Sequence, residues 1–78
     1  MVFPKVAKIL ADIIEIDSED ITPETELTNE YGIKAVDVAK LVIECEKKFK
    51  IFIHDEDVHS FKCVNDVAEY IKRIQADW

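Results

Sequence analysis

Three parts of this chain place apolar residues at the three- and four-residue spacing of an amphipathic helix. The spacing predicts helices over residues 3–15, 36–49 and 64–74. The last of them carries one apolar stripe, formed by Val64, Val67, Ala68, Ile71 and Ile74. With only one glycine and two prolines among 78 residues, the chain lacks the turn residues that an all-β fold needs.

The segments between these helices are short, with one exception. The stretch DSEDITPETELTNEYG is rich in turn-forming residues and long for a loop in a compact domain. We expect its own apolar residues, Ile21, Leu27 and Tyr31, to anchor it. At residues 54–61, the stretch HDEDVHSF predicts one short helical turn capped by Asp55. KIFI, at residues 50–53, has no partner segment and is not expected to form a strand.

The predicted fold class is therefore all-α. We expect a small bundle of three main helices plus one short helix, with a long loop between helices one and two, in a single domain over residues 1–78. A chain of this length supports one core of a few kcal/mol at most. We expect it to be a monomer.

The charge and the apolar pattern exclude several classes of partner. The formal net charge is −7, which disfavours nucleic acid and anionic membrane surfaces and favours a cationic partner surface. That charge also argues against a DNA-binding helix-turn-helix protein, although the helix count fits one. Because no apolar run approaches about 20 residues, we expect no membrane insertion. We interpret the two cysteines, Cys45 and Cys63, as free thiols of a cytoplasmic protein.

Apolar residues of the second predicted helix fall on two sides. Val38, Leu41, Val42, Cys45 and Phe49 share the side expected to face the core. Val36 and Ile43 lie nearly opposite, beside Lys40 and Lys47. Single exposed apolar residues are common in soluble proteins, so one interpretation gives these two no role. The other is a docking face for a partner protein, formed by Lys34, Val36, Asp37, Lys40, Ile43, Glu44 and Lys47.

The start of the second helix carries an unexpected residue. If the helix begins at Val36, its N-cap is Ala35, and alanine is one of the poorer N-cap residues. A residue with a hydroxyl or another short polar side chain is expected there. An alanine without visible compensation indicates a functional or altered position.

Residues around this position resemble a known family. YGIKAVDVAKLVIECEKKF resembles the prosthetic-group site and second helix of acyl carrier proteins, whose motif is Gly-x-Asp-Ser-Leu followed by Asp or Glu. LTNEYG before it and FKIFIHDEDVHSFKCVNDVAEYI after it extend the resemblance, without gaps, from about Leu27 to Ile71. The resemblance implies a carrier and not an enzyme. It also implies 4'-phosphopantetheine as cofactor, with a phosphopantetheinyl transferase and acyl-transfer enzymes of biosynthesis as partners.

Matched position by position, the motif serine that receives phosphopantetheine falls on Ala35, which has no nucleophilic oxygen. One interpretation is a serine-to-alanine change that leaves the carrier in its apo form. The other is a carrier-like interaction module that works unmodified and docks through its second helix. Lys34 replaces the motif aspartate, Val36 the leucine, and His54 a later proline. From these departures we hypothesise a specialised carrier for fatty-acid or related lipid or polyketide biosynthesis.

Two metal-site arrangements are considered and set aside. His54, His59, Cys63 and Cys45 supply zinc-ligand types, but their spacing matches no known ligand pattern. The acidic loop lacks the glycine and the final glutamate of an EF-hand. The sequence contains no recognisable catalytic set, so we predict neither a metal site nor an active site.

Overall fold

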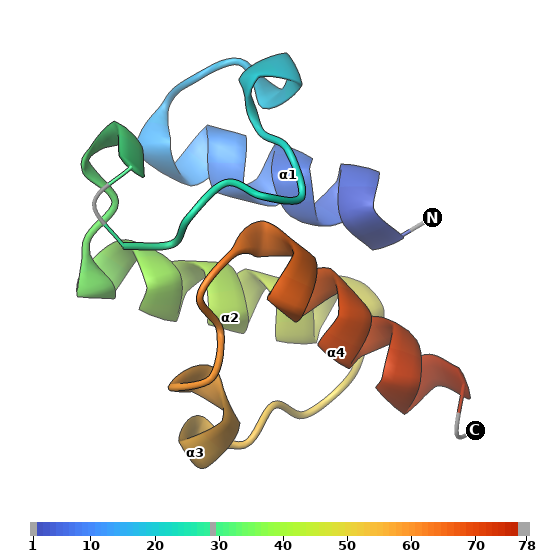
Figure 1. Cartoon of the computed structure of the whole chain (residues 1–78). Coiled ribbons are helices and arrows are strands. Elements are labelled where there is room, and N and C mark those ends of the chain that lie inside the picture. The colour runs from blue at the N-terminus through green and yellow to red at the C-terminus, as the bar shows by residue number, and fades with distance from the viewer. Residues whose placement is uncertain (1, 29, 77–78) are drawn as a thin grey trace.

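A computed structural model describes residues 2–28 and 30–76, so Asn29 of the LTNEYG segment lies outside the described residues. The elements in chain order are α1 (Val2–Ile14), the 3-10 turns η1 (Ser18–Asp20) and η2 (Glu30–Gly32), α2 (Ala35–Phe49), α3 (Asp55–Val58) and α4 (Val64–Ala76). Apart from one antiparallel bridge between Glu26 and Cys63, the described residues contain no β-structure. The prediction of an all-α bundle with one short helix is confirmed (Figure 1).

The core forms around α1, which packs against both α2 and α4. Each long helix buries one stripe, made of Val6, Ala7, Leu10 and Ala11 in α1, Leu41, Val42 and Cys45 in α2, and Val64, Val67, Ala68 and Ile71 in α4. In Figure 1, α1 and α2 lie one above the other, and α4 runs at an angle to both. The predicted core side of the second helix is confirmed, because Val38 and Phe49 also pack against this cluster.

Backbone hydrogen bonds fasten the long loop to the segment that leads into α4. Leu27 donates its N–H to the Lys62 carbonyl at 2.8 Å, and Val64 donates to the Thr25 carbonyl at 2.9 Å. The side chains of Ile21 and Leu27 are buried beneath the loop. These two anchors were predicted correctly, and the polar loop backbone is paired where it crosses the core.

The prediction for Tyr31 as an apolar anchor is wrong. Its side chain is 51% exposed, and its hydroxyl donates a hydrogen bond of 3.1 Å to the Asp20 carbonyl. Ile33, two residues later, is buried in its place. Tyr31 has a left-handed backbone conformation at φ 53°, and the chain turns sharply there before α2 begins.

The short helix α3 also starts differently from the prediction. Its N-cap is His54, which has an extended backbone, and Asp55 is the first helical residue and not the cap. The preceding segment is held without a strand, as expected, because buried Ile53 donates its N–H to the Glu46 carboxylate at 2.8 Å. That bond fixes the connection between α2 and α3.

The two thiols have different environments, which predicts different reactivity. Both cysteines are free, and Cys63 is partly exposed. Cys45 is fully buried, and this burial, together with the nearby charges of Glu44 and Glu46, raises its pKa to about 12. A thiol with a raised pKa stays protonated at any lower pH, and the thiolate is the reactive form.

We therefore expect iodoacetamide at about pH 8 to label the folded protein once, at Cys63, and to label Cys45 only after unfolding. Mass spectrometry of the intact protein counts the labels. The variant Cys63→Ala is the control and should remain unlabelled until denaturant is added. Labelling of Cys45 at the rate of Cys63 in the folded protein would contradict the described core.

Candidate functional site

Residue 35 lies where the long loop turns into α2. Ala35 is the first residue of that helix and its side chain is exposed. Gly32 has a φ of +70°, in the left-handed region that glycine adopts without strain, and Lys34 is extended. The chain therefore turns over three residues and presents the side chain of Ala35 to solvent at the mouth of a helix.

The N-cap of α2 is Lys34, so the prediction that Ala35 is the cap is wrong by one residue. The Lys34 carbonyl accepts the N–H groups of Asp37 at 2.9 Å and Val38 at 3.1 Å, which are the first bonds of the helix. An N-cap side chain normally accepts a hydrogen bond from the first turn, and an ammonium group cannot accept one. The residue that departs from the cap preference is therefore Lys34.

Asp37 supplies part of the missing capping. Its Oδ2 accepts the backbone N–H of Lys34 at 3.0 Å, which places a negative charge at the positive end of the α2 dipole. Asp66 has the same role in α4, where it accepts the N–H groups of Lys62 and Cys63. Those backbone hydrogen bonds lower the pKa of Asp66. The start of α2 thus has one hydrogen bond of a capping box, from the Lys34 N–H to the Asp37 side chain. It lacks the other, in which the N-cap side chain accepts a backbone N–H of the first turn.

An apolar hollow of about 630 Å³ opens beside residue 35. Its walls come from the loop, α2, α3 and the segment before α4: Leu27, Thr28, Ile33, Lys34, Ala35, Val38, Ala39, Val58, His59 and Phe61. Because most of these side chains are apolar, the hollow can shelter an apolar group brought to the start of α2.

The outer side of α2 carries the other residues named from the sequence. Val36 is 55% exposed and Ile43 is 49% exposed, so both point away from the core as expected. Lys40 and Lys47 are exposed on the same side, and Lys47 lies 3.7 Å from the Glu44 carboxylate. A docking role for these residues stays a prediction.

Sequence reasoning missed Phe52. Its side chain is 70% exposed and contacts the His54 ring edge-on, with the ring centroids 5.0 Å apart. Together with Ile43 and Val58 it lines a second hollow of about 470 Å³ between α2 and α3. The only sequence signal was an aromatic residue in a short segment that belongs to no helix.

Two kinds of feature are absent from residues 2–28 and 30–76. No group of three or more histidine, cysteine, aspartate or glutamate side chains there is arranged to hold a metal ion. None of the helices in that part of the chain has both the length and the apolar character needed to cross a membrane.

Comparison with known proteins identifies the family to which the chain is similar. The family model described as "Phosphopantetheine attachment site" matches residues 4–71. An acyl carrier protein of Phytoplasma mali is 36% identical over 73 residues, which cover 94% of this chain and 87% of the relative. One of Clostridium perfringens is 35% identical over 69 residues, covering 88% and 91%. One of Syntrophobacter fumaroxidans is 35% identical over 72 residues, covering 92% and 89%.

The chain belongs to the acyl carrier protein family, whose members are carriers and not enzymes and whose prosthetic group is 4'-phosphopantetheine. In this chain, the residue at the start of α2 does not fit that group. Ala35 ends in a methyl group, and a phosphodiester bond to the protein needs a side-chain oxygen. The hollow beside residue 35 is compatible with the cargo of a carrier, but the attachment chemistry is missing from the side chain.

The capping defect yields a stability prediction. Lys34→Asp places an acceptor at the N-cap and a negative charge at the positive end of the helix dipole, and should stabilise the protein by about 1 kcal/mol. Chemical denaturation measures the change. Lys34→Ala removes the charge without adding an acceptor, so it should recover only a small part of the gain. Equal stability of the wild type and Lys34→Asp would show that the cap lies elsewhere.

Proposed function

We propose that residue 35 is the attachment position of an acyl carrier and that Ala35 keeps this chain in the unmodified, apo form. The observation that carries the proposal is the combination of an exposed first helical residue with an apolar hollow at its side. A modifying enzyme can reach a side chain in that place. An acyl chain tethered there lies next to apolar walls.

The proposal extends to the partners of the carrier, its pathway and its location. With serine at position 35, the partners are a phosphopantetheinyl transferase and acyl-transfer enzymes of fatty-acid or related lipid or polyketide biosynthesis. Lys40 and Lys47 on the outer side of α2 support a specialised carrier with dedicated partners. We place the protein in the cytoplasm, as a monomer.

A second candidate function is an interaction module that works unmodified and docks through α2. The observation that favours it is the neighbouring cap. Lys34 differs from the family motif as well as Ala35, and Lys34 leaves the helix start poorly capped. Loss of a serine alone accounts for one of these departures and not for both.

The direct test restores the hydroxyl. Ala35→Ser, incubated with coenzyme A and a phosphopantetheinyl transferase, should gain the mass of one phosphopantetheinyl group, while the wild type gains none. Ala39→Ser is the matched control, because Ala39 is also exposed on α2, about one turn further along. It should stay unmodified.

Three outcomes separate the candidates. Modification of Ala35→Ser alone supports residue 35 as the attachment position. Modification of Ala39→Ser to the same extent would show that the transferase accepts any serine on this helix. If Ala35→Ser stays unmodified although it folds like the wild type, the interaction module is the better account.

A further inference from the structure

The short helix α3 depends on other elements for its position. It has four residues, Asp55–Val58, and none of them is buried. A helix of that length is not stable by itself in water, so contacts with the rest of the chain must hold it. Val58 packs against the core, and the bond from the Ile53 N–H to the Glu46 carboxylate fixes the segment before the helix.

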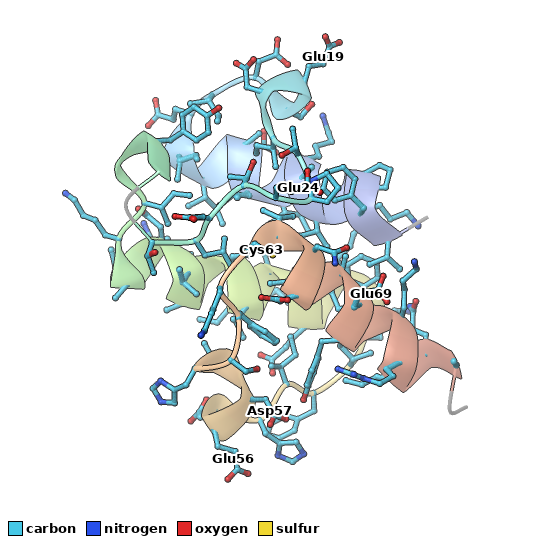
Figure 2. The ribbon with its side chains drawn as sticks, viewed as in Figure 1. Glu19, Glu24, Glu56, Asp57, Cys63 and Glu69 are labelled. Carbon is cyan, nitrogen blue, oxygen red and sulfur yellow. The ribbon has the colours of Figure 1, made fainter. Side chains whose placement is uncertain are left out.

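A hydrogen bond from α4 fixes α3 itself. The Tyr70 hydroxyl donates to Asp57 Oδ2 at 2.7 Å, and a bond to a carboxylate is stronger than one between neutral groups. Burial, followed by the bond to Asp57, raises the pKa of Tyr70, so the hydroxyl keeps its proton near neutral pH and remains the donor. Figure 2 shows Asp57 on the part of α3 nearer to α4, whereas Glu56 points away from the molecule.

The ring of Tyr70 makes a second contact. Its centroid lies 5.2 Å from that of Phe61, in an edge-to-face arrangement. Phe61 is buried and forms part of the wall of the hollow beside residue 35. Tyr70 therefore acts on that hollow in two ways, through Phe61 with its ring and through α3 with its hydroxyl.

The end of α3 separates the hollow beside residue 35 from the one that Phe52 lines. Ala39, Val58 and His59 belong to the walls of both hollows. Ala39 is on α2, whereas Val58 is the last residue of α3 and His59 is its C-cap. A shift of α3 away from α2 would therefore join the hollows of about 630 Å³ and about 470 Å³ into one larger space.

We propose that Tyr70 is a positioning residue that limits the size of the cargo, because its hydrogen bond to Asp57 keeps α3 between the two hollows. The proposal rests on the proposed function, in which an acyl chain attached at residue 35 lies against the walls of the hollow. With the bond in place, the chain fills the hollow beside residue 35 and meets Val58 of α3. Without the bond, α3 moves outward and a longer chain reaches the apolar residues of the second hollow.

Amide exchange followed by NMR tests the hydrogen bond. Tyr70→Phe removes the hydroxyl and keeps the ring against Phe61. We expect the hydrogen-bonded amides of residues 57–61 to exchange about tenfold faster than in the wild type, while amides within α1 keep their rates. Tyr31→Phe is the matched control, because the hydroxyl that it removes is bonded to the Asp20 carbonyl in the long loop.

Alkyl chains attached at residue 35 test the limit on cargo size. With Ala35→Cys in a Cys63→Ala background, alkyl methanethiosulfonates from ethyl to dodecyl each add one chain as a disulfide, while Cys45 is protected by its burial. Each further methylene that enters the hollow leaves water and should raise the melting temperature until the hollow is full. We expect this rise to continue to longer chains when Tyr70→Phe is added, and to stop at the original length when Tyr31→Phe is added.

Two substitutions of Asp57 distinguish positioning from a general loss of stability. Asp57→Asn keeps an acceptor for the Tyr70 hydroxyl, so it should stay closer to the wild type in both measurements than Asp57→Ala does. Asp57→Ala removes the acceptor and should reproduce Tyr70→Phe. A merely structural role would lower the melting temperature equally at every chain length and leave the longest stabilising chain unchanged.

Several results would overturn the proposal. They are unchanged exchange of the α3 amides in Tyr70→Phe, an unchanged limiting chain length, equal effects of Tyr70→Phe and Tyr31→Phe, and the absence of stabilisation by any chain. None of them bears on whether Ala35→Ser accepts phosphopantetheine. Failure of that modification likewise leaves the alkyl series unaffected, because chemical attachment needs no transferase.

Discussion

The structure depends on the burial of α1 between α2 and α4. A chain of 78 residues has one core, and α1 supplies the helix that both of the other long helices cover. Leu41 and Cys45 of α2 are fully excluded from solvent by this contact. Because a helix is rigid, burying that side fixes its rotation and turns Val36 and Ile43 outward. The exposure of Val36 and Ile43 is therefore a consequence of the core.

The position of the N-cap changes the interpretation of residue 35. With Lys34 as the cap, Ala35 is the first helical residue, where alanine is a good helix former. The methyl group there is no structural fault, so capping gives no reason to expect a hydroxyl. The family motif places an aspartate just before its serine, and aspartate is a favoured N-cap residue. The residues matched to that aspartate and serine by the resemblance are Lys34 and Ala35, so this turn differs from the motif at both positions.

The helices were predictable because their information is local. Apolar spacing placed the core sides of α2 and α4, and the buried Ile21 and Leu27 followed from the rule that a long loop needs apolar anchors. The failures concern features set by partners distant in sequence or by single backbone angles. The bond from Leu27 to the Lys62 carbonyl joins residues far apart in the chain. The left-handed Tyr31 depends on a turn that no spacing rule describes.

The candidate site shows the same division between local and distant information. The exposure of Val36 and Ile43 followed from the helix period, whereas the hollow beside residue 35 needs walls from the loop, α2 and α3 at once. Phe52 was missed because its segment has no period to place it. A pattern within one helix predicts which side faces solvent, and only the assembled fold shows what borders that side.

The net charge of the whole chain says little about the charges that surround any one element. Salt limits the reach of an exposed charge to about 8 Å at physiological ionic strength. A group close to α2 therefore meets both signs of charge, from Lys40 and Lys47 and from Asp37 and Glu44, and is little affected by the acidic loop and α3. The 15 residues of α2 carry three carboxylates and three lysines, so the helix itself is neutral although the chain has a net charge of −7.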